Sequence, residues 1–412
     1  MSLPGVRVTL SPVVWSDIDS RGRNRRQGRS SDEDTPNLAL GLLELSPKRR
    51  KKALGLPAVY YPPALSPSEK VWRDRSDFLV KKGYQLRPRY QHNWTPTKYG
   101  NGRHHHSGED HIMQILPQVL DAIRRKDGLV VCVKMIQDPQ KLKQIKIVEY
   151  FTSRRMLNDS RNHVVPFYDT FKDIITPHIE YMVMPVLRRF DDPEFLMVFE
   201  VVDFVTQSLE GLAFLHENNI AHHNLTAEHI MMDAKSIVPT GWHFVSHFCE
   251  PDGMTRISPL DRKNHSVRYY FIGFGDSYHI SPTQMPLVVD IGGNDTSAPE
   301  LLTFQPYDPF KLDIYTLGNV IHNELFTKYH GLEFLTELVE YMRAADFQKR
   351  PNSDSILRSW YRIRNSLDEA TIEDQPLRFK EGMKPRYTYD SDPQSSVLNR
   401  SFKRDISSIL NK

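Results

Sequence analysis

The spacing of apolar residues changes along this chain, and this change limits the possible fold more than any other feature. Residues 129–136 and 181–185 are short runs of β-branched and other apolar residues, which are typical of buried strands. Further along, the apolar residues of 202–212 and of 314–325 recur at helical spacing. Strands followed by helices predict an α+β domain of two lobes, a small β-rich N-lobe and a helical C-lobe.

The two ends of the chain differ in composition from this domain. Residues 1–75 are rich in Ser, Pro and Arg, and the chain as a whole has 28 prolines and only 39% hydrophobic residues. Such a composition suits one sizeable core with disordered flanks. The sequence therefore predicts a disordered basic arm over 1–75, a folded domain over 76–365 with its N-lobe ending near 185, and a mostly disordered tail over 366–412.

A block of basic residues in the arm is the clearest targeting feature. Residues 48–52 read Lys-Arg-Arg-Lys-Lys, and such a block is either a nuclear-import signal or a solvated run of charge. Residues 1–70 hold 12 Lys and Arg against 7 Asp and Glu, a surplus of +5, whereas the net charge of the whole chain is only +3. The rest of the chain is therefore slightly acidic. Nucleic acid is therefore not an expected partner, except through the arm.

The cysteines and the hydropathy pattern bear on the compartment. Cys132 and Cys249 are the only two cysteines and lie far apart, so they cannot build a disulfide framework and a reducing compartment is expected. No stretch approaches the roughly 18 apolar residues of a membrane-spanning helix. The first residues are too short in apolar length for a signal peptide. We therefore expect a protein of the cytoplasm, the nucleus or both, without a membrane partner.

Six short motifs follow one another along the domain. In this order they resemble the signature set of protein kinases over about residues 110–365. Details such as Asn162-His163 also resemble a group of fungal kinase-like proteins. The motifs are Lys134 in the 129–136 run, His222-His223-Asn224 with His229 after it, Gly273-Phe274-Gly275, Ala298-Pro299-Glu300, Asp313 with Gly318, and Arg350-Pro351.

The resemblance implies three contacts that hold the scaffold together. Glu300 is expected to be a buried carboxylate paired with Arg350, because such a desolvated pair needs both partners. Asp313 is expected to hold the backbone of the turn at His222. The side chains of His222 and Phe274 are expected to pack in the apolar column that joins the two lobes.

The same resemblance implies that the chemical positions have changed. Asn224 stands where protein kinases have the catalytic aspartate, and an amide cannot take up a proton at neutral pH. His229 stands at the metal-binding asparagine, although Mg²⁺ prefers hard oxygen ligands. Gly273 replaces the aspartate of the Asp-Phe-Gly motif and offers no ligand. No metal site is therefore predicted.

The nucleotide side of the cleft is also incomplete in the sequence. No glycine lies between Gly108 and Gly128, where the resemblance places a glycine-rich loop over the phosphates. Lys134 is either an ATP contact or a structural residue of its strand, and Glu149 is named as a substitute for its acidic partner. ATP is admitted as a ligand only without tightly held Mg²⁺. The hinge is expected at Met184, Pro185 and Leu187.

An insertion separates two of the motifs. Residues 234–268 lie between the His229 region and the strand expected before Gly273, and they include Trp242, Phe244 and Phe248. A long excursion with aromatic residues is either a docking surface or a loop that closes onto its own domain.

These observations favour a pseudokinase that acts as an interaction or regulatory module with protein partners. The alternative is an atypical, active ATP-dependent Ser/Thr kinase in which Asp276 or Asp233 supplies a missing ligand. A third hypothesis, a nuclear protein associated with nucleic acid, depends on the basic arm alone.

Overall fold

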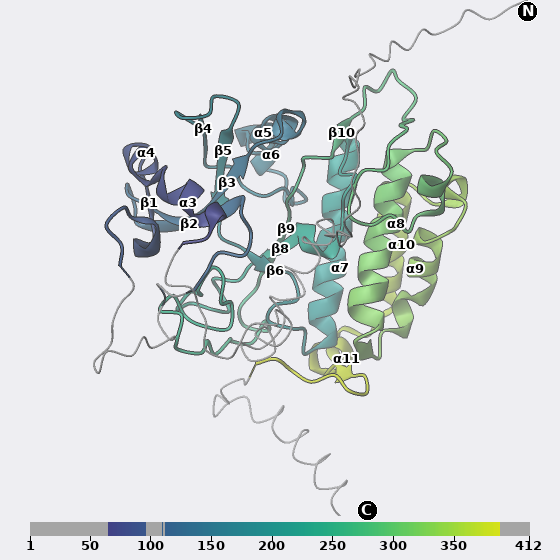
Figure 1. Cartoon of the computed structure of the whole chain (residues 1–412). Coiled ribbons are helices and arrows are strands. Elements are labelled where there is room, and N and C mark those ends of the chain that lie inside the picture. Colours follow the sequence, from purple (N-terminus) through teal and green to yellow (C-terminus); the bar gives the residue numbers. More distant parts are fainter. Residues whose placement is uncertain (1–64, 96–108, 110–111, 388–412) are drawn as a thin grey trace, which may run out of the picture. The chain divides into compact units, whose positions relative to one another are not determined.

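The computed structural model describes residues 65–95, 109 and 112–387 (Figure 1). The predicted import signal at 48–52 and most of the predicted arm lie outside the described residues. The end of the predicted tail, residues 388–412, also lies outside them.

A five-stranded antiparallel sheet forms the core of the N-lobe, in the order β1-β2-β3-β5-β4. The strands predicted at 129–136 and 181–185 are confirmed. A tight turn joins β2 to β3, and Gly128 in it has a φ of 72°, which glycine adopts without steric strain. The strands are β1 (Tyr84–Leu86), β2 (Val119–Arg124), β3 (Leu129–Ile136), β4 (Asp169–Lys172) and β5 (Glu180–Pro185).

Short helices flank this sheet. One face of α5 is buried, because its apolar residues recur every three or four positions. The buried side chains include Ile145, Val148 and Phe151. A capping box between Ser66 and Glu69 begins α3. The helices of this lobe are α3 (Pro67–Arg73), α4 (Ser76–Lys81), α5 (Lys143–Phe151) and α6 (Arg154–Leu157).

The C-lobe is helical, and its centre is the long helix α7. This helix buries most of its residues against α8 and α10, which lie beside it in Figure 1. At its end α8 continues as a π-helical turn, His322–Phe326. The helices are α7 (Val198–Glu217), α8 (Pro309–Ile321), α9 (Thr336–Met342), α10 (Ser353–Ser366) and α11 (Glu369–Asp374). The domain therefore has the predicted two-lobed α+β kinase-like fold.

Small sheets at the base of the cleft bring the motifs together. The turn at 222–229 runs from β7 to β8, and the turn at 273–275 runs from β9 to β10. Since β8 pairs with β9 and β7 pairs with β10, the two turns lie next to each other. These strands are β6 (Arg188–Arg189), β7 (Ile220–Ala221), β8 (Ile230–Asp233), β9 (Arg268–Phe271), β10 (Tyr278–His279), β11 (Tyr329–His330) and β12 (Arg378–Phe379).

The predicted boundary of the arm at residue 75 is wrong. Residues 67–73 form α3, and its Trp72 is fully buried and donates from Nε1 to the carbonyl oxygen of Pro117 at 2.8 Å. The buried carboxylate of Glu69 pairs with Arg89 at 2.7 Å. The folded domain thus begins at least ten residues earlier than predicted, because partners far along the chain anchor this segment.

The predicted boundary of the tail at 366 is wrong for a similar reason. β12 pairs with β11, and Tyr387 is buried. The phenol ring of Tyr387 contacts Phe248, and its hydroxyl group accepts from Arg188 at 2.6 Å. Residues 366–387 are therefore part of the domain.

The insertion at 234–268 packs onto the domain. Ile237, Val238 and Ile257 are buried in the main core cluster, and the guanidinium of Arg188 lies 5.3 Å from the centre of the Trp242 ring. The sequence left open whether the insertion is a docking surface or a loop that closes onto its own domain. Closure onto the domain accounts for these buried residues.

A contact between the lobes involves the same insertion. Arg87 follows β1, and its guanidinium lies 2.9 Å from both Glu109 Oε1 and His243 Nε2. The backbone at Gly253 is also so close to Ile112 that a Cβ atom there would meet the Ile112 side chain at 2.6 Å. The connection between β1 and β2 is thus fixed to the C-lobe insertion.

Among the helices of the described residues, none has both the length and the apolar character needed to span a membrane.

Candidate functional site

Asp313 on α8 organises the turn that carries the first motif. Its carboxylate accepts from the backbone N–H groups of His222 and His223, each at 2.7 Å, and lies 3.0 Å from His216 Nε2. The Asp313 side chain is fully buried, so these bonds form in a region of low dielectric constant, where they are strong. The predicted function of Asp313 as a backbone anchor matches this geometry.

His222 packs in the predicted apolar column. Its ring centre lies 4.7 Å from that of Phe274, and its Nε2 donates to the carbonyl oxygen of Ile272 at 2.9 Å. Because a carbonyl only accepts, this bond places the proton on Nε2. Burial lowers the pKa of His222, so the ring is neutral and serves as scaffold.

Glu300 and Arg350 form the second predicted scaffold contact. Nη1 and Nη2 of Arg350 donate to the two carboxylate oxygens of Glu300 at 2.5 and 2.8 Å. Both residues are buried, and the guanidinium also lies 4.5 Å from the ring centre of Tyr315. This bidentate geometry is the strong form of such a pair.

His229 and Gly273, the two positions to which the resemblance assigns metal binding, face each other. A Cβ atom at Gly273 would lie 2.7 Å from His229 Nε2 and would overlap the Cδ2 atom of the same ring. The imidazole therefore fills the space that a side chain at 273 would need. Burial lowers the pKa of His229 to about 3, so the ring is uncharged at neutral pH.

Asn224 is held by two hydrogen bonds. Its Nδ2 donates to Asp276 Oδ2 at 3.1 Å, and its Oδ1 accepts from the backbone N–H of Asn294 at 2.9 Å. Asp276 in turn lies 3.4 Å from the ammonium group of Lys141. Burial raises the pKa of Asp276, but Lys141 and Asn224 outweigh it and lower that pKa below its usual value.

Lys134 has a neutral partner on α5 rather than an acidic one. Its Nζ donates to Oε1 of the buried Gln144 at 2.7 Å. Glu149, the partner suggested from the sequence, is exposed on the other face of the helix, so that suggestion is wrong. Burial lowers the pKa of Lys134. The ion pair between strand lysine and helix glutamate that an active kinase needs is thus replaced by a hydrogen bond to an amide.

The connection between β1 and β2 is long, and its residues 96–108, 110 and 111 lie outside the described part of the chain. Residues 87–118 join the neighbouring strands β1 and β2, and Val119 at their end pairs with Lys134. The backbone N–H of Gln114 lies 3.4 Å from Glu69 Oε1. Together with the Arg87 contact described above, this bond fixes the connection at both ends.

The predicted hinge residues lie at the junction of the two lobes. Met184 and Pro185 end β5, and Leu187 comes just before β6. The side chains of Met184 and Leu187 are buried. Contact between these residues and a nucleotide stays a prediction.

The donor groups of the cleft do not fit a magnesium ion. A neutral imidazole and a glycine occupy the two metal-binding positions that the resemblance implies, whereas Mg²⁺ favours several hard oxygen ligands. Among the described residues, no group of three or more His, Cys, Asp or Glu side chains is placed to hold a metal ion.

The sequence did not predict that Gln144 and Lys141 belong to this site, because neither residue lies in a distinctive local pattern.

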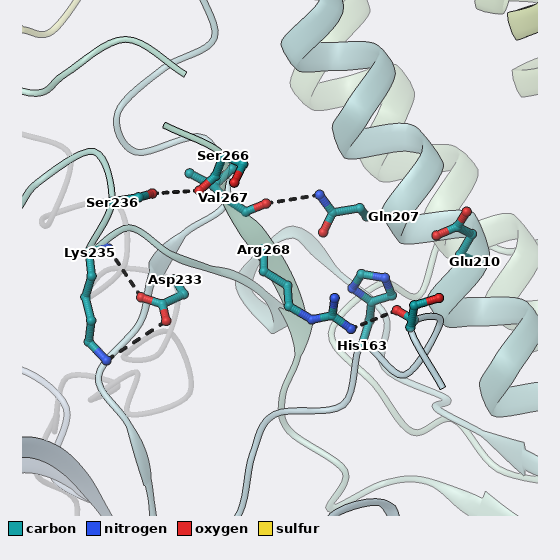
Figure 2. Close-up of a pocket in the computed structure, with 10 residues that line it drawn as sticks. His163, Gln207, Glu210, Asp233, Lys235, Ser236, Ser266, Val267 and Arg268 are labelled. Atoms are coloured by element: carbon teal, nitrogen blue, oxygen red, sulfur yellow. Dashed lines mark hydrogen bonds and ion pairs between the residues drawn. The ribbon is translucent and has the colours of Figure 1, made fainter. Parts of the chain in front are cut away.

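A separate hollow of about 480 Å³ lies beside α7 (Figure 2). Its charged side chains already have partners. Arg268 donates to the carbonyl oxygens of Ser160 and Asn162 at 2.8 and 3.0 Å, and Lys235 lies 4.0 Å from Asp233. The residues of the kinase motifs do not line this hollow, so it is not part of the cleft between the lobes.

Comparison with known proteins agrees with the two-lobed fold. Residues 116–333 match the protein kinase domain family. The chain is 32% identical over 130 residues to the serine/threonine-protein kinase SSK22 of Saccharomyces cerevisiae, a match over 29% of this chain and 10% of that protein. It is 26% identical over 207 residues to sperm motility kinase 1 of Mus musculus, over 49% of this chain and 35% of that protein.

The chain thus spans only a minor part of either relative. The family match, in contrast, covers more than half of the chain and the whole cleft between β3 and α8. On this match and on the scaffold contacts around Asp313 and Glu300, the chain belongs to the protein kinase domain family.

Proposed function

We propose that this chain is a pseudokinase, a protein kinase fold that acts on protein partners through its surfaces and does not transfer phosphate. The observation that carries the proposal is the His229 ring, which fills the space beside Gly273. An active kinase holds its metal ions through the residues at these two positions. Without them, the charge that develops on a migrating phosphoryl group has nothing to neutralise it.

Two further features of the cleft support the proposal. Asn224 replaces the carboxylate that accepts the proton of the substrate hydroxyl, and loss of a general base lowers a rate by about 100- to 10,000-fold. Lys134 bonds to the amide of Gln144, so it lacks the ion pair that positions it in active kinases. These losses affect separate parts of the reaction and act together.

A phosphate-transfer assay tests the proposal. The full chain is incubated with labelled ATP and Mg²⁺ or Mn²⁺, with general acceptor proteins and alone. We expect the signal of the natural protein to equal that of a Lys134→Ala variant prepared in the same way. Transfer that is present in the natural protein and lost in the variant contradicts the proposal.

One observation favours the second candidate, an atypical active kinase. The carboxylate of Asp276 lies 3.1 Å from Asn224, close to where a base or ligand is missing. Its pairing with Lys141 argues against that use, because the ammonium already balances its charge. If Asp276 serves catalysis, Asp276→Asn abolishes transfer, whereas the exposed-site control Asp252→Asn does not.

The partners are proposed to be proteins, met in the cytoplasm or the nucleus. Nuclear entry is proposed to depend on the basic block 48–52. A fluorescent fusion of the full chain is expected to leave the nucleus when these five residues are changed to Ala, and an unchanged distribution contradicts the import hypothesis.

A further inference from the structure

Lys134 identifies the face of the N-lobe sheet that covers the cleft. Side chains two residues apart on a strand share a face, so Cys132 lies beside Lys134 on that face of β3. Cys132 pairs with Asp121 on β2 and with Met184 near the end of β5. Since β5 leads into the junction of the lobes, Cys132 and Asp121 lie on that side of Lys134. In the protein kinase fold this lysine contacts the phosphates of ATP, so the base of a nucleotide would lie under these two residues.

Charged side chains occupy this part of the sheet. Arg87 follows β1, and its Nε lies 3.0 Å from Asp121 Oδ1. Its Nη1 lies 2.9 Å from both Glu109 Oε1 and His243 Nε2. We call these four residues the Arg87 cluster. Sites for small organic ligands are lined mostly by apolar and aromatic side chains, whereas this surface carries ion pairs.

Solvent has little access to the cluster or to the strand beside it. His243 and Asp121 are exposed by only 2 and 8%, and Cys132 by 7%. A base that stacked on this surface would have to displace the Arg87 guanidinium. The Asp121 carboxylate would then be buried without its cation, which is strongly unfavourable.

The C-lobe insertion holds the cluster in place. His243 belongs to the insertion, and its Nδ1 accepts from the backbone N–H groups of Val245 and Ser246 at 3.2 and 2.9 Å. This turn fixes the ring within the cluster. A second contact lies nearby, because a Cβ atom at Gly253 would lie only 3.3 Å from the Cα atom of Glu109. The insertion therefore meets the N-lobe at two points beside this surface.

We propose that the Arg87 cluster is an autoinhibitory contact, which closes the base side of the cleft to purine nucleotides for as long as the insertion is docked on the N-lobe. The inference rests on the proposed function and deepens it. A cleft without metal ligands is, in addition, occupied by the chain's own side chains.

The reactivity of Cys132 tests this inference. The chain has two cysteines, so in a Cys249→Ser background Cys132 is the one thiol. Burial raises the pKa of Cys132 to about 12, so at pH 8 the thiol reacts only when the cleft opens.

The first variant is His243→Asn. Asparagine keeps an oxygen that accepts from the backbone N–H of Ser246, but it is too short to reach Arg87. We expect slow labelling of Cys132 by iodoacetamide in the background chain, and labelling at least about tenfold faster in the variant. Arg87→Met, which removes the contact from the N-lobe side, is expected to act in the same way.

A matched control separates opening of the cleft from loss of N-lobe stability. Arg75 forms an ion pair with Asp173 at 2.5 Å within the N-lobe, and both side chains are buried. Arg75→Met therefore also removes a buried cation, but not one that contacts the insertion. It is expected to change the labelling rate of Cys132 by less than about threefold.

Three results overturn the inference. One is labelling of Cys132 as fast in the background chain as in His243→Asn and Arg87→Met, and another is equal acceleration by Arg75→Met. The third is slower labelling of the background chain in the presence of millimolar ATP, because a base would then reach the covered surface. The phosphate-transfer assay is separate: an open cleft without transfer overturns this inference alone, whereas transfer by a chain with a protected Cys132 overturns the proposed function.

Discussion

Positions 229 and 273 constrain each other, because the His229 ring fills the space that a side chain at 273 would need. Restoring the aspartate alone as Gly273→Asp would drive a side chain into the His229 ring. We expect this variant to lose about 1–3 kcal/mol of unfolding free energy through overpacking, measured by urea denaturation. The double variant Gly273→Asp with His229→Asn is expected to recover most of this loss.

A matched control isolates the collision from backbone strain. Gly83 also has a positive φ, 95°, but a Cβ atom there would meet nothing within 4 Å. Gly83→Asp therefore reports only the strain, about 1 kcal/mol. If Gly273→Asp is no more destabilising than Gly83→Asp, the result contradicts a collision between a side chain at position 273 and the His229 ring.

Two histidines with lowered pKa values predict how stability depends on pH. Burial lowers the pKa of His163 to about 4 and that of His229 to about 3, whereas an unfolded histidine titrates near 6.5. Below that value the unfolded chain binds protons that the folded chain does not, so stability is lost as the pH falls. From pH 7.5 to pH 5, each histidine is expected to contribute a loss of about 2 kcal/mol.

The measurement is urea unfolding at both pH values for the natural protein and for His163→Gln. Glutamine keeps a donor for the carbonyl oxygen of Tyr269, which the His163 Nδ1 atom approaches at 2.8 Å, but it does not titrate. The pH dependence of the variant is expected to be smaller. An equal pH dependence in both proteins contradicts a neutral, buried His163.

Between elements, the contact of the β1–β2 connection with the insertion is one of the links between the two lobes. Arg87 faces Glu109, Asp121 and His243 at once. Arg87→Met leaves the two carboxylates without a cation and is expected to cost about 1–3 kcal/mol. Hydrogen exchange is expected to become faster in β2 and in residues 234–268.

The exposed ion pair of Arg358 and Asp354 supplies the control. Both side chains are more than half exposed, so Arg358→Met is expected to change stability by less than about 0.5 kcal/mol. If hydrogen exchange in β2 and in residues 234–268 is as slow in Arg87→Met as in Arg358→Met, this contact does not link the lobes.

For the domain as a whole, the boundaries observed in the structure predict which fragment folds. Residues 65–387 keep Trp72 and Tyr387, both buried, whereas the sequence-based boundaries 76–365 remove both. Loss of a buried Trp alone costs about 3–5 kcal/mol. We expect fragment 65–387 to give a cooperative thermal transition by circular dichroism and fragment 76–365 to lack one. Cooperative unfolding of the shorter fragment contradicts these boundaries.

The sequence predicted the elements whose signals are local. The runs at 129–136 and 181–185 are β3 and β5, and the helical spacing at 202–212 lies in α7. The contacts of Asp313 and of Glu300 with Arg350 could be predicted because motif order implied them. The pairing of Lys134 with Gln144 could not, and neither could the docking of α3 and of Tyr387, because these depend on residues brought together only by tertiary folding.

Titration of ATP into the full chain, with Mg²⁺ and with a chelator, tests the central claim most directly. A cleft whose metal positions hold a neutral imidazole and a glycine gains nothing from the ion, so the affinity for ATP is expected to be the same within about twofold in both conditions, or undetectable in both. An affinity that rises more than about tenfold when Mg²⁺ is added would show that the cleft holds the metal, and would contradict the account.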